Sequence, residues 1–246
     1  MKRVLFLLLC FPLFANAQLL GLGSNIVKVN LSSLALKNYS FSFERKISKR
    51  VSLVLGYRTE PKGSPPFQSQ FENIINSSDI NFSRFEIGNT AWTPEVRFYL
   101  GKGNMRGFYV APYMRFASFD VTSPVRYSTT VSGTLYTKDA DFSGKITSTN
   151  GGLMIGTQHR LFKVLVIDIW IIGGHYGSSK GDLNFAATTP LTPQEQSALK
   201  QNLDKIDAKP FKFTNTVYAD GSGAKITSDG PWAGIRGAGI NIGFHF

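Results

Sequence analysis

The heptapeptide VSLVLGY at residues 51–57 carries a bulky apolar side chain at every second position. Such alternation with a period of two predicts a β-strand with one apolar face. The same alternation recurs at residues 39–44, 95–100, 108–116, 165–171 and 237–246. Adding a strand at residues 26–36, with a bulge near Ser32-Ser33, and another at residues 152–161 predicts an all-β chain of about eight strands.

The connections between these strands alternate in length. The short ones lie at residues 48–50, 101–106 and 162–163, and the long ones at residues 60–86, 120–150 and 177–231. Bacterial transmembrane barrels combine an even number of strands with short periplasmic turns and long extracellular loops. We therefore predict a closed antiparallel transmembrane β-barrel with long extracellular loops and both termini in the periplasm.

The N-terminus has the three parts of a signal peptide. Lys2 and Arg3 precede an apolar run at residues 4–14, and Ala15-Asn16-Ala17 is a small-x-small cleavage site. We predict a signal peptide at residues 1–17, cleaved near Ala17, and a barrel domain at residues 18–246 of the outer membrane. A lipoprotein box at Leu9-Cys10 is the alternative, although Leu is larger than the residue this box requires. Cys10 is the only cysteine, so the cleaved chain has no disulfide or cysteine-based metal site.

The formal net charge is +11, but the basic residues are scattered along the chain. For an exported protein we expect contact with outer-membrane lipid and lipopolysaccharide phosphates, and no nucleic-acid partner.

The last long connection contains the one convincing helix. Thr192-Pro193-Gln194-Glu195 is a capping box with proline at the first helical position, and Leu199, Leu203 and Ile206 follow at helical spacing. We predict a helix over residues 191–207 that packs on the extracellular loops. Contact between these loops and a protein partner is the alternative role.

Charged residues occur on the face of the strands opposite the apolar one. The predicted lumen charge network consists of Glu44, Arg58, Glu95, Arg97, Arg115, Arg160 and Asp168. Buried charges must be paired, and an eight-stranded barrel is just wide enough for its own side chains to fill it. We therefore expect a closed lumen, with a narrow pore as an alternative.

The C-terminal segment GINIGFHF at residues 239–246 resembles the signal by which the outer-membrane assembly machinery recognises barrels, with Phe244 and Phe246 as its aromatic positions. Residues 25–58 and 94–116 are similar to a family of uncharacterised outer-membrane barrels from the Bacteroidetes, small eight-stranded barrels of the OmpA/OmpX kind. The resemblance implies a fold and a location, and it supplies no reaction or ligand.

These observations favour a non-enzymatic barrel with a structural, adhesive or complex-forming role, with no catalytic residues, cofactor or metal. The enzymatic alternative is a lipid A hydrolase or acyltransferase. Its base would be His175, with Ser178 or Ser179 as nucleophile and Asp182 nearby. Such a triad needs these groups within hydrogen-bond reach of one another.

Overall fold

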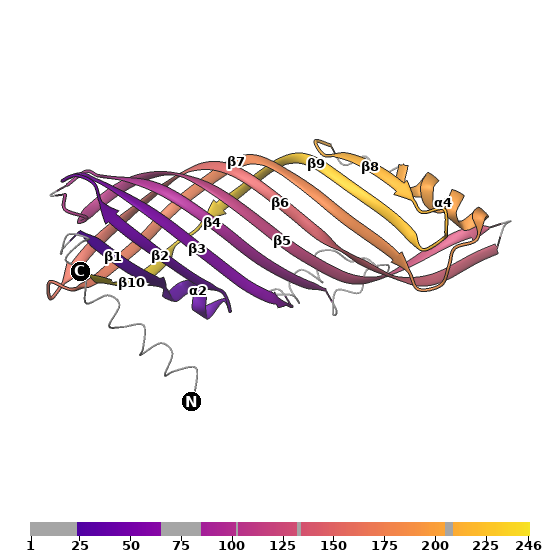
Figure 1. Cartoon of the computed structure of the whole chain (residues 1–246), viewed down its shortest axis with the longest axis horizontal. Coiled ribbons are helices and arrows are strands. Elements are labelled where there is room, and N and C mark those ends of the chain that lie inside the picture. The colour runs from indigo at the N-terminus through magenta and orange to yellow at the C-terminus, as the bar shows by residue number, and fades with distance from the viewer. Residues whose placement is uncertain (1–23, 65–84, 102, 132–133, 205–208) are drawn as a thin grey trace, which may run out of the picture.

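The computed structural model describes residues 24–64, 85–101, 103–131, 134–204 and 209–246 (Figure 1). The predicted signal peptide and most of the connection at residues 60–86 lie outside these residues.

In these described segments, ten antiparallel strands form a single sheet that closes on itself. They are β1 (Asn25–Asn30), β2 (Tyr39–Lys46), β3 (Val51–Gly63), β4 (Glu86–Tyr99), β5 (Gly107–Val131), β6 (Thr134–Leu161), β7 (Leu165–Ala187), β8 (Lys212–Val217), β9 (Gly223–Arg236) and β10 (Gly239–His245). β10 pairs with both β1 and β7 and so closes the ring. The predicted closed antiparallel barrel is confirmed.

The ring has eight strand positions, and the eighth is divided. β9 pairs with the later part of β7 and β10 with its beginning, so the two share one position on either side of Gly237 and Ala238. β8 lies outside the ring because, of the described strands, it pairs with β9 alone.

The ends of the described chain meet at one end of the barrel, which we call the terminal end. The carbonyl oxygen of Phe246 accepts hydrogen bonds from the backbone nitrogens of Ser24 (3.1 Å) and Asn25 (3.0 Å). Helix α4 (Pro193–Asp204) and the β5–β6 hairpin lie at the opposite end, which we call the projecting end (Figure 1).

The first strand is shorter than predicted. β1 ends at Asn30, where the expected strand over residues 26–36 gives way to helix α2 (Leu31–Ala35). The side chain of Asn30 accepts a hydrogen bond from the Ser33 backbone nitrogen at 2.7 Å and so caps the helix. The change of parity at Ser32-Ser33 therefore marks a capped helical turn, and the predicted bulge was wrong.

Much of the sequence predicted as long loops is strand. β5 and β6 remain paired from Gly107↔Gln158 to Val131↔Thr134, through residues 120–150. β7 runs to Ala187, well into the predicted loop at residues 177–231. Apolar alternation identifies a strand only where one of its faces is shielded from water and the other is not. These extensions have no continuous apolar face, so the pattern that locates strands disappears while the backbone pairing continues.

The outer face of the ring carries an apolar band. Phe41, Leu53, Trp92, Phe108, Leu153, Ile172 and Phe244, which come from seven different strands, are between 45% and 59% exposed. The side chains of the opposite parity are mostly buried in the lumen. In β1, for example, Ile26, Lys28 and Asn30 are buried, whereas Val27 is exposed. Large apolar side chains exposed all around a cylinder indicate a surface that faces lipid.

Helix α4 packs at the projecting end over a small apolar core that includes Leu199, Leu203 and Phe185. Its capping box forms as predicted, since Glu195 accepts from the Thr192 backbone nitrogen at 2.9 Å. A hydrogen bond from Lys138, together with that from Thr192, lowers the pKa of the Glu195 carboxyl below its usual range. Within the described residues, no helix is both long and apolar enough to span a membrane.

Candidate functional site in the lumen

A buried ion network fills the lumen near the terminal end. We call it the lumen network, and its charged members are Lys28, Glu44, Glu95, Arg97, Asp168 and Arg236. The ammonium of Lys28 lies at its centre. It donates to Glu44 Oε2 at 2.6 Å, to Asp168 Oδ2 at 2.8 Å and to Gln158 Oε1 at 2.8 Å.

Arg97 is the second centre of the network. Its Nη1 lies 2.8 Å from Asp168 Oδ2, and its Nη2 lies 3.1 Å from Glu95 Oε2. The other oxygen of Glu95 accepts from Arg236. Three basic and three acidic groups are thus joined in a charge-balanced set. All of these side chains are 0% or 1% exposed except Arg236, at 13%.

Neutral side chains complete the network around the ring. Tyr99 and Ser52 both donate to Glu44 Oε1 at 2.6 Å, and Tyr109 donates to Asp168 Oδ1 at 2.7 Å. Every one of the eight strand positions contributes at least one side chain, with Asn241 of β10 donating to the Asp168 carbonyl at 3.0 Å. Because each buried carboxylate has several donors, the network offsets the large cost of removing these charges from water.

The terminal end is also covered by a turn. Met105, in the β4–β5 connection, is only 2% exposed, and its carbonyl accepts from Gln158 Nε2 at 3.0 Å. The lumen at this level is therefore occupied by packed and hydrogen-bonded side chains.

The structure divides the predicted charge network into three groups. Glu44, Glu95, Arg97 and Asp168 belong to the lumen network. Arg58 and Arg115 lie higher, toward the projecting end, and line a cavity. Arg160 lies apart from both at the terminal end, 3.5 Å from the carbonyl of Asn104.

Sequence reasoning missed two of the charged members of the network. Lys28 alternates with Val27 and Val29, which gave a usable signal for an inward charge, but the parity of this strand was not assigned. Arg236 ends a strand with no continuous apolar face, so nothing in its neighbourhood indicated an inward side chain.

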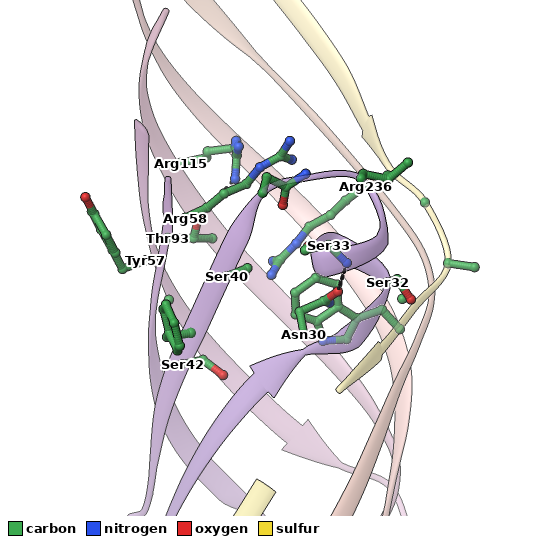
Figure 2. A pocket seen from close by; sticks show the side chains of 18 of the residues that line it. Asn30, Ser32, Ser33, Ser40, Ser42, Tyr57, Arg58, Thr93, Arg115 and Arg236 are labelled. Atoms are coloured by element: carbon green, nitrogen blue, oxygen red, sulfur yellow. Dashed lines mark hydrogen bonds between the residues drawn. The ribbon is translucent and has the colours of Figure 1, made fainter. Parts of the chain in front are cut away.

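A cavity of about 270 Å³ lies on the projecting side of the network. Arg58 and Arg115 reach it from one side and Arg236 from the other (Figure 2). Arg236 also stacks on Trp170, with its guanidinium carbon 4.1 Å from the ring centroid. Arg115 Nη1 donates to Thr93 Oγ1 at 3.3 Å.

The structure does not assemble the enzymatic alternative. His175 Nδ1 lies 3.1 Å from the hydroxyl of Tyr113. Ser179 instead donates to the Gly230 carbonyl at 3.4 Å, and Asp182 pairs with Lys225 at 2.9 Å. Ser178 is three residues from His175 on the same strand, so the two side chains point to opposite faces. Among the described residues, the predicted base therefore has neither nucleophile nor orienting carboxylate.

The described residues contain no group of three or more His, Cys, Asp or Glu side chains placed to hold a metal ion.

Residues 3–202 match the family described as "Protein of unknown function (DUF3575)". The chain belongs to this family. A comparison with curated protein sequences found no match.

Solved structures similar to this chain are bacterial proteins at low identity. CarO of Acinetobacter baumannii is 13% identical, with a TM-score of 0.42 over 92% of this chain and 99% of its own. CarO2 of the same species is 12% identical, with a TM-score of 0.40 over 91% and 97%. The N-terminal β-barrel domain of OprF from Pseudomonas aeruginosa is 11% identical, with a TM-score of 0.32 over 92% and 99%.

Proposed function

We propose that this chain is an integral outer-membrane barrel with a sealed lumen, whose projecting strands and helix α4 serve contacts outside the membrane in a structural, adhesive or complex-forming role. The observation that carries the proposal is the lumen network. A pore needs a continuous water path, whereas all eight strand positions here contribute to a buried, charge-balanced plug. The proposed role involves no catalysis and no cofactor.

The apolar band supports the membrane location. In water, so many half-exposed aromatic and aliphatic side chains would favour aggregation. In a bilayer they contact the apolar acyl chains of the lipids. The terminal end would face the periplasm, with the signal peptide cleaved near Ala17, and the projecting end would face outward. Lipid and lipopolysaccharide would surround the band, and a protein partner would contact the projecting end.

Heat-modifiable migration tests the location and closure of the barrel together. We expect unboiled protein from the membrane fraction to migrate faster on a denaturing gel than boiled protein, because a closed hydrogen-bonded barrel stays compact in detergent. Equal migration, with the protein in the soluble periplasmic fraction, would refute the membrane proposal.

The C-terminal aromatic residue is proposed as part of the signal read by the assembly machinery. Deleting Phe246 should reduce the amount of the protein in the membrane several-fold. The deletion also removes the backbone hydrogen bonds to Ser24 and Asn25. Phe246→Ala keeps those bonds and removes only the ring. We expect this variant to refold in detergent like the wild type and yet to assemble poorly in cells. Normal membrane levels of Phe246→Ala would count against the assembly role.

A further inference from the structure

Three arginines line the lumen cavity, and carboxylates compensate only part of their positive charge. Arg236 is neutralised by Glu95 within the lumen network, and Arg58 pairs with Glu60 at 3.1 Å. Arg115 has no carboxylate partner among the ion pairs of the described residues, although it shares the cavity with two other guanidinium groups. The described residues that line the cavity include no Asp or Glu. A cluster of like charges is unfavourable unless a counter-charge joins it.

Two side chains that line the cavity each carry a buried nitrogen with no hydrogen-bond partner among the described residues. Trp170 is only 9% exposed, and its Nε1 has no hydrogen-bond acceptor in the part of the chain that the structure describes. The Nε of Arg58 is likewise buried and unpaired. Both nitrogens are fully buried and are not exposed to the open cavity, so the charge of Arg115, in a lining without Asp or Glu, is what indicates a place for an anion.

The lumen network bounds the cavity on one side along the barrel axis, and an aromatic contact narrows the lumen on the other. The lumen network fills the lumen on its terminal side. On its projecting side, Phe119 of β5 and Trp232 of β9 meet across the lumen with ring centroids 5.1 Å apart. Each lies four residues beyond a cavity arginine, Arg115 and Arg236 respectively, toward the projecting end. Four residues of strand correspond to about 13 Å.

The wall beside the cavity is incomplete. β1 ends at Asn30, and β8 pairs only with residues 224–229 of β9. Residues 230–236 of β9 therefore have no second strand neighbour in the described part of the chain. The short helix α2 lies in this gap, in contact with β10 and β2. The cavity lining reaches the outer face here, since it includes Leu36, Phe41 and Ile235, which are 42%, 45% and 81% exposed.

From these observations we infer that the cavity binds a phosphate group, and that the group enters sideways through the gap between α2 and β9. A tetrahedral phosphate presents oxygens in several directions, which suits arginines arriving from β3, β5 and β9. The apolar rim of the gap favours the headgroup of a phosphate-bearing amphiphile in the membrane as the source, and free phosphate is the other source of the same chemistry.

The test uses the purified, folded barrel in neutral detergent micelles. Trp92→Phe and Trp232→Phe leave Trp170 as the reporter, and its fluorescence is followed during two titrations. One adds inorganic phosphate, and the other adds phosphatidic acid to the micelles, with phosphatidylcholine as its blank. Arg115→Gln is the test variant, and Arg160→Gln, at the terminal end and outside the cavity, is the matched control.

We expect saturable binding that Arg115→Gln weakens at least ten-fold and Arg160→Gln leaves unchanged. Saturation by phosphatidic acid alone assigns the ligand to the membrane, and saturation by inorganic phosphate assigns it to solution. No saturation in either titration, or equal binding by the two variants, would overturn the inference.

A second measurement separates binding from structural support. Without ligand, Arg115→Gln should be at least as stable to urea as the wild type, because it removes repulsion from Arg58 and Arg236. Marked destabilisation would show that Arg115 supports the fold and would overturn the inference. The inference goes beyond the proposed function, and its failure would leave the heat-modifiable, sealed barrel standing.

Discussion

Asp168→Ala is expected to lower the free energy of unfolding by about 3–5 kcal/mol, the usual consequence of breaking a buried ion pair. Asp168 is 0% exposed and accepts from Lys28 and Arg97, both at 2.8 Å. Its loss leaves two buried cations with fewer acceptors, and it also leaves the Tyr109 hydroxyl unpaired. Urea unfolding of the barrel refolded into lipid vesicles, followed by the loss of the fast-migrating gel form, measures the change.

The matched control is Asp182→Ala on the same strand. Asp182 pairs with Lys225 at 2.9 Å, but its side chain is 60% exposed. Exposed pairs contribute little because water and salt screen them. If Asp182→Ala destabilised the barrel as much as Asp168→Ala, the lumen network would not be its main electrostatic support.

Gly156→Ala is expected to lower the free energy of unfolding by about 3 kcal/mol, through overpacking and a lost buried hydrogen bond. A Cβ at this position would lie 2.3 Å from the Tyr109 hydroxyl and 2.8 Å from the carbonyl of Ile169. Tyr109 would have to move, which removes its bond to Asp168 and its ring from beneath the Arg97 guanidinium, now 4.3 Å away.

Gly151→Ala on the same strand provides the control. No atom lies within 4 Å of the Cβ it would add, so we expect its stability to equal or slightly exceed that of the wild type. The same urea titration compares both variants. Equal effects would mean that β6 resists any added side chain and that the contact with Tyr109 is unimportant.

The lipid-facing part of the barrel was predictable because one face of each strand must be apolar there. The alternation at residues 51–57 and its repeats located the ring, and the inward parity of Glu44, Glu95, Arg97 and Asp168 followed from it. Where strands leave the apolar band this constraint ends. The extensions of β5, β6 and β7 therefore read as loops, although their backbones stay paired.

Which charges meet could not be predicted from parity alone. Parity placed Arg58, Arg115 and Arg160 on the same face as Arg97, but the height of each residue along its strand depends on register and strand tilt. The divided eighth position hid Arg236, because β9 lacks the apolar face that marks β10. The inward position of Lys28 could have been predicted from the sequence, since both its neighbours are outward-facing valines.

The measurement that tests the sealed lumen most directly is conductance in a planar lipid bilayer. Purified, heat-modifiable protein is inserted in concentrated KCl, with an open porin as positive control and the fast-migrating gel form as proof of folding. We expect no stable unitary steps from the wild type, because the lumen network occupies the terminal end around the whole ring. Reproducible steps whose number grows with the amount of inserted protein would contradict the account and establish a pore.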